Sequence, residues 1–339
     1  MSSPNMRTSV PKAQPPLNLK GFLQKHLADR RLHPKSLVSA YFGDIVMPND
    51  GYTWVETLFS VFENLGINER LVRTTLFRMR EEGWLDATRA GRKSYYEQTD
   101  HAKRQTFLAE RLVYQSDAPN WDGSWILVFM VVGKIDSAVK RKFMEELGWV
   151  GIGMVTKGVW AHPSANTELI GELIEQLDLA GKVICMRCQN IRDVALGLPI
   201  DDRELTSLCM SVSNVEDDYK KFIEDYFPLL DQNGEFSLLG SAAELLSFRI
   251  TMLNEFRRIQ LRDPHLPSDL LPKDWARHCA YLLCGDVYKQ IFSASNSEYP
   301  RLQTKAGVVS KNLDSDDWQR QVKEPLYKQR FKETKGPTL

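Results

Sequence analysis

The pattern of hydrophobic and polar positions predicts a helix over residues 68–82. Signals for its start and stop lie at both ends. Asn68 is suited to cap the first turn, Glu69 lies at the positive end of the helix dipole, and Gly83 ends the helix. Four residues recur at steps of three and four, so they fall on one face of the helix, which is predicted to be its buried side. They are Val72, Thr75, Leu76 and Met79.

A short hairpin follows this helix, and another helix precedes it. Residues 84–87 and 93–98 have the pattern of two strands joined by a basic turn over 89–92, and residues 51–65 form the preceding helix. This is the outline of a winged helix-turn-helix, whose second helix lies in the DNA major groove and whose wing touches the DNA backbone or minor groove. The candidate DNA-binding residues are Arg70, Arg73, Thr74, Arg78, Arg89, Arg92 and Lys93.

Arginines on a helix face are, by themselves, more often a solvated surface than a binding site. Here Thr74 lies among the arginines, so charged and hydrogen-bonding groups are mixed. The basic turn adds further cations close by. These features favour DNA binding over a solvated surface.

The rest of the N-terminal region completes this domain. A helix begins at Pro34 and runs to Val46, so we expect the winged domain to span 34–116. Residues 1–33 are rich in Ser, Pro and Asn near their start and are expected to form a flexible arm, with a short amphipathic helix over 19–32.

A second domain begins after the polar linker at 116–120. Residues 125–132 form a continuous apolar strand of the kind buried on both faces. The following segments predict the order helix, strand, strand, helix, strand. This order is that of a ferredoxin-like fold, expected over 121–200.

The third part is helical. Helices are predicted over 203–208, 215–230, 242–262 and 274–292, which gives a helical domain over 201–302 and a charged, mobile tail over 303–339. The predicted fold class is therefore α+β and multidomain: a winged helix-turn-helix, a ferredoxin-like central domain and a helical C-terminal domain.

Composition limits the functions. The chain has 339 residues, enough for two or three domains, and a formal net charge of +0 from 44 basic and 44 acidic residues. Any nucleic-acid contact must therefore come from a local patch. Five cysteines without a disulfide framework, no apolar signal segment and no membrane-length apolar run predict a cytoplasmic protein without membrane contact.

The sequence contains few residue patterns of the kind that an enzyme active site requires. Cys185 and Cys188 form a CxxC, but no second pair has matching spacing, so no metal site or cofactor is expected. Asp122 and Asp136 flank the first strand of the central domain, which leaves a metal-dependent nuclease or hydrolase as the alternative function. The favoured interpretation is that Asp122 is a linker residue and that Asp136 caps a helix. No catalytic residue is predicted.

Three segments carry a resemblance to a known family. They are residues 36–46, residues 66–85 with the following 91–96, and residues 261–275. On these segments the chain resembles, over about 34–300, the phenylacetic acid degradation repressors, the PaaX family of transcriptional regulators. The resemblance implies a homodimer that binds double-stranded operator DNA upstream of genes for aromatic-acid catabolism. It also implies release by an aryl-acetyl-coenzyme A thioester such as phenylacetyl-CoA.

A coenzyme A thioester needs cationic groups for its phosphates and an apolar slot for its aryl group. We expect this effector between the ferredoxin-like and helical domains, and the alternative for the same residues is core packing and ion pairing. The linker at 116–120 is the expected hinge, so a fragment over 35–115 should bind a half-site alone. The candidate effector-binding residues are Arg249, Arg257, Arg258, Arg262, Trp275, His278 and Tyr281.

Overall fold

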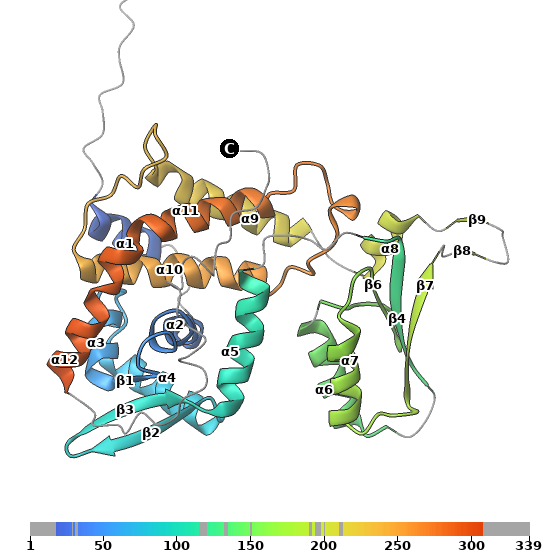
Figure 1. Cartoon of the computed structure of the whole chain (residues 1–339), viewed down its shortest axis with the longest axis horizontal. Helices are drawn as coiled ribbons and strands as arrows, with labels where there is room; N and C mark the ends of the chain where they lie inside the picture. The colour runs from blue at the N-terminus through green and yellow to red at the C-terminus, as the bar shows by residue number, and fades with distance from the viewer. Residues whose placement is uncertain are drawn as a thin grey trace, which may run out of the picture.

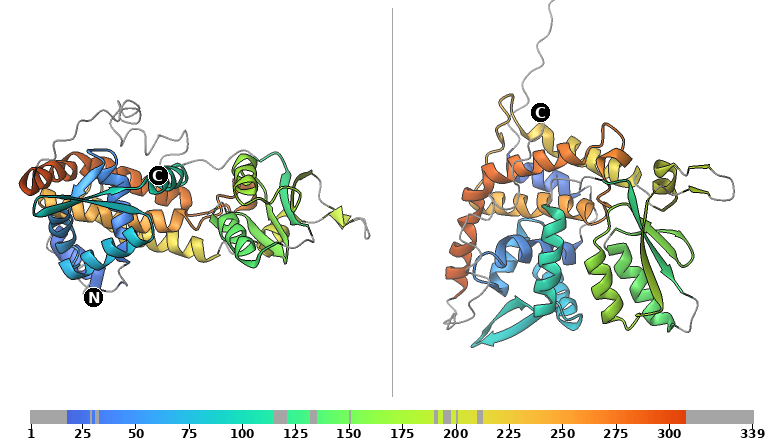
Figure 2. Two further views of the ribbon diagram at one scale, coloured as in Figure 1. Left: turned by 90° about the horizontal axis from the view of Figure 1, so that it is seen from below. Right: turned by 45° about the vertical axis from the view of Figure 1, so that its right-hand side comes forward.

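The computed structural model has mixed helices and strands arranged in two parts (Figure 1). A helical part with a small sheet lies on one side, and a sheet covered by two helices lies on the other, as a second pair of views also shows (Figure 2). The residues that the structure describes are 18–28, 30, 33–114, 121–131, 135–149, 151–189, 192–193, 198–199, 201–209 and 213–307.

The N-terminal region contains five α-helices, a π-helical turn and a three-stranded sheet with order β1-β3-β2. The hairpin register pairs Leu85 with Gln98 and Ala90 with Lys93. Gly91 makes the turn, with a φ of 63° that a residue without Cβ adopts readily. The elements are α1 (Leu19–Ala28), α2 (Pro34–Tyr41), η1 (Phe42–Val46), β1 (Tyr52–Trp54), α3 (Val55–Glu63), α4 (Glu69–Glu81), β2 (Leu85–Ala90), β3 (Lys93–Gln98) and α5 (Asp100–Val113).

The central region is a four-stranded antiparallel sheet with order β5-β6-β4-β7 and two helices against one face. This order, with helices after the first and third strands, is that of a ferredoxin-like unit. Its elements are β4 (Ser124–Met130), α6 (Ser137–Trp149), β5 (Gly153–Thr156), β6 (Val159–His162), α7 (Thr167–Gln176) and β7 (Val183–Gln189), followed by the small pair β8 (Arg192–Asp193) and β9 (Leu198–Pro199).

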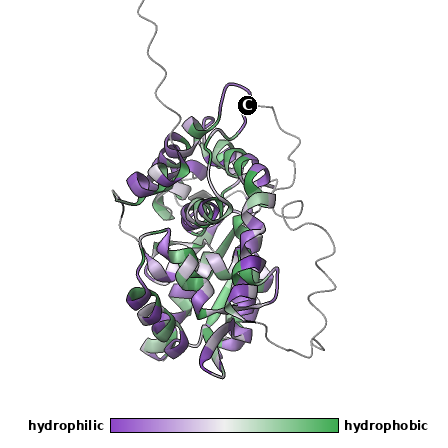
Figure 3. Cartoon of the chain, turned by 90° about the vertical axis from the view of Figure 1, so that its left-hand side faces the viewer, coloured by the Kyte–Doolittle hydropathy of each residue, from purple (hydrophilic) through white to green (hydrophobic). Residues whose placement is uncertain are grey.

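The C-terminal region is helical. Its longest helices, α10 and α11, pack along each other. Hydrophobic and hydrophilic residues are mixed along the helices of the chain (Figure 3). Ser241 and Glu244 form a capping box that starts α10. The elements after the central sheet are α8 (Asp202–Cys209), which packs against β5 and β6 of that sheet, and then those of the bundle: α9 (Ser213–Tyr226), η2 (Phe227–Leu229), α10 (Ala242–Gln260), η3 (Ser268–Leu270), α11 (Arg277–Asn296) and α12 (Glu298–Ala306).

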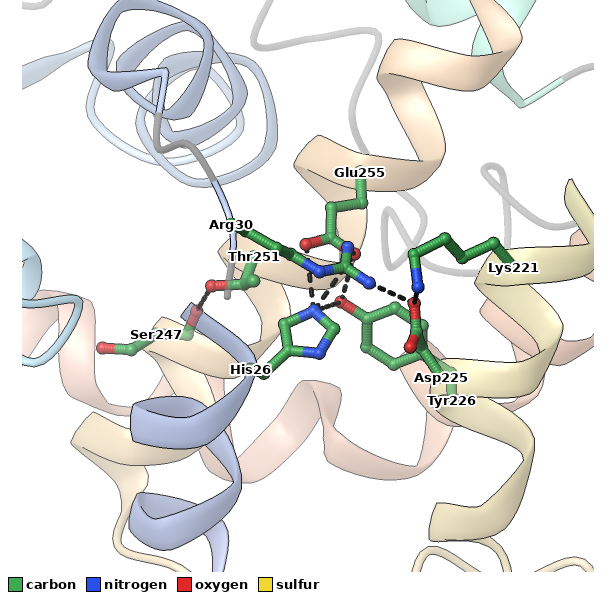
Figure 4. A network of polar contacts seen from close by, with 8 residues as sticks. All are labelled: His26, Arg30, Lys221, Asp225, Tyr226, Ser247, Thr251 and Glu255. Atoms are coloured by element: carbon green, nitrogen blue, oxygen red, sulfur yellow. Dashed lines mark hydrogen bonds and ion pairs between the residues drawn. The ribbon is translucent and has the colours of Figure 1, made fainter. Parts of the chain in front are cut away.

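The expected flexible arm over 1–33 needs correction where the structure describes it. Leu19, Phe22 and Leu23 of α1 are buried in the core of the helical bundle. Polar contacts add to this packing, since His26 Nε2 lies 3.0 Å from Glu255 Oε1 on α10, and Arg30 Nη1 lies 2.6 Å from Glu255 Oε2 (Figure 4). The amphipathic pattern of this segment was visible in the sequence, but its docking partners lie more than 190 residues away.

Glu255 is the centre of this network and receives a third hydrogen bond from Tyr226 Oη, at 2.9 Å. Burial by itself would raise the pKa of Glu255, but the hydrogen bond and charge of His26, with Arg30 and Tyr226, outweigh it and hold the pKa below its usual value. The carboxylate therefore stays charged and fixes α1 to α9 and α10.

Other boundaries also shift. The predicted helix over 34–46 is α-helical only to Tyr41 and continues as a π-helical turn, and the last predicted helix starts later, at Arg277. The tail was expected from residue 303, yet α12 continues to Ala306, with Pro300 tolerated because it lies in the first turn. The expected hinge at 116–120 and the tail from 308 lie outside the described residues.

Candidate DNA-binding surface

Helix α4 is built by the local signals at its ends. The Asn68 side chain accepts a hydrogen bond from the Leu71 amide at 2.9 Å, which satisfies one of the free amides of the first turn. Gly83, with a φ of 73°, ends the helix. Val72, Thr75, Leu76 and Met79 are its buried residues, as the periodicity predicts.

The opposite face of α4 is exposed and cationic. Arg70, Arg73, Thr74 and Arg78 are all exposed. The Arg73 guanidinium lies over the Phe59 ring of α3, 4.5 Å from its centroid, and 3.7 Å from Glu69. The Thr74 hydroxyl donates to the Arg70 carbonyl at 2.9 Å, so its oxygen keeps lone pairs that face outward.

The β2–β3 hairpin supplies a second cationic segment. Arg89 and Arg92 are exposed at its tip, and Arg89 Nε donates to the Gly91 carbonyl at 3.2 Å. Lys93 is different, because it is half-buried and its ammonium donates to the Ala306 carbonyl at the end of α12. The structure therefore gives Lys93 an anchoring contact, whereas Arg89 at the end of β2 and Arg92 in the turn are exposed.

The hairpin and α4 lie at the same end of the molecule, and α9 and α11 lie at the other (Figure 1). In DNA-binding proteins of the helix-turn-helix class an exposed helix enters the major groove, and cationic side chains beside it contact the phosphates.

Helix α12 clamps the sheet behind the hairpin. Gln303 Oε1 accepts hydrogen bonds from the Trp54 amide at 3.2 Å and the Thr57 hydroxyl at 2.9 Å. Tyr299 Oη donates to the Tyr52 carbonyl at 2.6 Å. These residues were missed from the sequence, since a charged segment near the C-terminus carries no local sign of what it packs on.

A buried ion pair joins this region to the helical bundle. Arg249 on α10 is fully buried, and its Nε donates to Asp44 Oδ2 of the π-helical turn at 2.6 Å. Tyr288 Oη donates to Asp44 Oδ1 at 2.8 Å, and Ser295 accepts from Arg249 at 3.0 Å. The expectation that Arg249 faces an effector is corrected here, because α10 is surrounded by other helices and leaves this side chain no outward face.

The remaining arginine candidates lie in different environments. Arg257 is half-buried, and burial lowers its pKa, although Tyr114 and Glu110 oppose that shift. The cavity beside it has a volume of about 20 Å³, enough for one water molecule. Arg258 is exposed, and Arg262 pairs with Asp218 at 2.7 Å.

Two of the three aromatic candidates, Trp275 and Tyr281, pack within the bundle. Trp275 is half-buried with its ring centroid 6.1 Å from that of Tyr219, and His278 is half-buried. Tyr281 is buried and its hydroxyl donates to the Tyr114 carbonyl at 3.2 Å, towards α5. The seven candidates are thus divided between the α10 junction, the surface and the bundle core, and a thioester could bind them together only after side chains move.

The central domain meets the bundle through a narrow contact. His162 Nε2 lies 2.8 Å from the Pro264 carbonyl, and Nδ1 accepts from the Ser164 amide at 3.0 Å. This arrangement assigns the proton to Nε2 of a neutral ring. Burial lowers the pKa of His162 to about 4, with the nearby His265 adding to the effect and the Pro264 hydrogen bond opposing it.

Comparison with known proteins identifies the family. Residues 33–102 match the family described as PaaX-like protein, residues 118–196 match the PaaX protein central Cas2-like domain, and residues 211–299 match the PaaX-like protein C-terminal domain. Transcriptional repressor PaaX of Escherichia coli (strain K12) is 32% identical over 269 residues, which are 77% of this chain and 81% of that protein. The chain belongs to the PaaX family.

A solved structure adds a distant likeness. The uncharacterized protein Rv0674 from Mycobacterium tuberculosis is 17% identical, covers 77% of this chain and 95% of its own, and superposes with a TM-score of 0.49. The PaaX family matches carry the assignment, and the ferredoxin-like strand order agrees with the Cas2-like description of the central domain.

The alternative enzymatic residues have structural partners in this PaaX-family chain. Asp136 caps α6, accepting from the Ala138 amide at 2.8 Å. Asp122 accepts from the Ser124 hydroxyl and amide, and these hydrogen bonds, with the charge of Arg187, lower its pKa. Within the described ranges, no three His, Cys, Asp or Glu side chains gather as a metal site would require, and no helix there is long and apolar enough to cross a membrane.

Proposed function

We propose that this chain is a transcriptional repressor that binds operator DNA through a winged helix-turn-helix formed by α3, α4 and the β2–β3 hairpin. The observation that carries the proposal is the exposed cationic face of α4 beside an arginine-tipped hairpin at one end of the molecule. The name of the E. coli relative supports the repressor role. One such surface is small, so a two-fold dimer on two half-sites is proposed.

The arginines of α4 have separate roles in this proposal. Arg70 and Arg78 are exposed and read bases. Arg73, already stacked on Phe59, contacts a phosphate and fixes the register of the helix. Arg89 and Arg92 add phosphate or minor-groove contacts that depend on salt.

The test measures affinity for a duplex selected by the full-length protein from a random library, against unselected duplex. Arg70→Ala and Arg78→Ala should each lose about 1–3 kcal/mol of discrimination at one base pair. Arg92→Ala should weaken both duplexes alike and reduce the salt slope by about one unit. Arg141→Ala, an exposed change on α6, is the charge-matched control. Unchanged affinity and specificity in all three test variants would remove α4 and the wing from the interface.

The effector in this proposal is an aryl-acetyl-CoA thioester such as phenylacetyl-CoA. Arg257 with Arg258 supports a site at the edge of α10, and the small cavity beside Arg257 implies that binding shifts α5 or α10. Because α10 also carries the buried contact to Asp44, such a shift reaches the DNA-binding region directly.

Linkage makes the effector testable. The thioester should weaken operator binding by the same factor by which operator weakens thioester binding, typically 5–150-fold. Calorimetry with phenylacetyl-CoA should give weaker binding to Arg257→Ala than to wild type, with Arg141→Ala as control. Equal binding by Arg257→Ala would move the site elsewhere, and no binding by wild type would reject this effector.

A further inference from the structure

An aromatic side chain lies at the middle of the exposed face of α4. Phe77 is 56% exposed, although it is a large hydrophobic residue on a helix whose other side is well buried. It follows Arg70 by seven residues, Arg73 by four and Thr74 by three. These spacings put all four on one helix face, with Phe77 nearly opposite the buried stripe.

The immediate surroundings of Phe77 are polar. The Arg80 guanidinium lies 5.6 Å from the centroid of the Phe77 ring, and Arg80 also lies 3.4 Å from Glu81. The Arg80 guanidinium therefore lies at one side of the Phe77 ring, and the exposed arginines of the same helix face lie at its other sides. In the free protein most of its apolar surface stays in water, which is unfavourable.

The DNA major groove offers one apolar group on base edges, the C5-methyl of thymine. A helix that enters the groove with Phe77 central would carry this ring to the bases, while the flanking arginines reach guanines or phosphates. We propose that Phe77 is a specificity-determining residue that recognises a thymine through its methyl group. This inference rests on the proposed DNA-binding function. It adds to the candidate DNA-binding residues a side chain that forms no hydrogen bonds with base edges.

The experiment removes one methyl group at a time. In a duplex selected by the wild-type protein, each thymine is replaced by deoxyuridine, which keeps base pairing and loses only the methyl. Wild type should bind about fourfold more weakly at one position in each half-site, equivalent to about 0.8 kcal/mol for one buried methyl group. Phe77→Ala should bind the thymine and deoxyuridine duplexes equally.

Matched controls separate recognition from general effects. Phe107→Ala removes a similarly exposed ring, 60% exposed, from α5, and Leu71→Ala removes a 41% exposed side chain from another side of α4. Both should keep the fourfold methyl dependence of wild type. Phe77→Leu, which keeps part of the apolar surface, should show a reduced dependence and covers the case in which Phe77→Ala binds too weakly to measure.

The outcomes are distinct. If wild type binds a selected duplex specifically but is indifferent to every deoxyuridine, or if Phe77→Ala and Phe77→Leu keep the full methyl dependence, the inference is overturned and the DNA-binding function stands. If wild type selects no duplex at all, the proposed function fails and this inference with it. A site selected by Phe77→Ala should also lose its preference for thymine at the same position.

Discussion

The DNA-binding region and the central sheet domain are attached to the helical bundle in different ways. The first shares its core with the bundle, since Leu246 and Ile250 of α10 and Tyr299 and Leu302 of α12 belong to the same cluster of buried residues as α2, α3 and α4. The buried Arg249–Asp44 pair reinforces that junction.

The central domain instead has a core of its own. The main cluster between its sheet and α6 and α7 contains residues from 126 to 183 alone, and the contact to the bundle is a smaller cluster that includes Leu270, with the His162–Pro264 hydrogen bond beside it. A shared core transmits a shift of α10 to the DNA-binding helices, because side chains in a close-packed interior have little empty space into which to move. A narrow contact leaves the central domain free to be repositioned as a unit.

Cutting the chain at these two junctions should have the largest effect. A fragment over 34–114 loses four side chains from its core, at roughly 1.5–3 kcal/mol each, which together approach the whole stability of a domain. We expect it to lack a cooperative thermal transition, in contrast to the half-site binder that the sequence suggested. A fragment over 121–209 should retain one, as measured by near-ultraviolet circular dichroism. A sharp transition in the first fragment would reverse the comparison.

Breaking the ion pair at the shared junction should be next in size. Arg249→Met leaves Asp44 buried without its cation and should cost about 3–5 kcal/mol of unfolding free energy. Urea denaturation followed by separate probes in the winged and helical regions should show both losing stability together. The control is Arg258→Ala on the exposed side of the same helix, expected within about 0.5 kcal/mol of wild type. Separate transitions for the two regions would argue against a shared core.

The central junction should be sensitive to acid through His162. Its pKa is about 4 in the folded chain and about 6.5 in the unfolded chain, so between these values only the unfolded chain binds the proton. Stability is therefore complete above pH 6.5 and falls on acidification to pH 4, by about 3 kcal/mol from this group. His162→Gln should flatten the pH dependence of urea unfolding, with exposed His101→Gln as the control. An unchanged slope would mean that the ring is not buried at this contact.

The clamp of α12 on the sheet should give the smallest of these effects. Gln303→Ala removes the acceptor for the Trp54 amide and the Thr57 hydroxyl and should cost about 1–3 kcal/mol. Amide hydrogen exchange should report faster opening at Trp54 than at the strands of the central sheet. Exposed Thr304→Ala is the neighbouring control, and equal protection in both variants would show that the clamp contributes nothing.

Much of α4 was predictable because its determinants are local. The Asn68 cap, the left-handed Gly83 and the stripe of buried residues all act within a few positions of one another. The same reasoning predicted the hairpin and the order of helices and strands along the central domain. It failed for Arg249, since helical periodicity on α10 describes one preferred face, whereas other helices surround this helix.

By itself, then, the sequence determined the caps and the buried stripe of α4, the order of the three regions and the cationic side of α4. The tertiary structure alone decided that α1 belongs to the bundle, that α12 holds the sheet behind the wing, and that Arg249 is an internal ion-pair partner. The physical reason is the distance along the chain over which each interaction acts. Capping and backbone preferences depend on neighbours within one turn, whereas burial of a side chain depends on which distant segments pack against it.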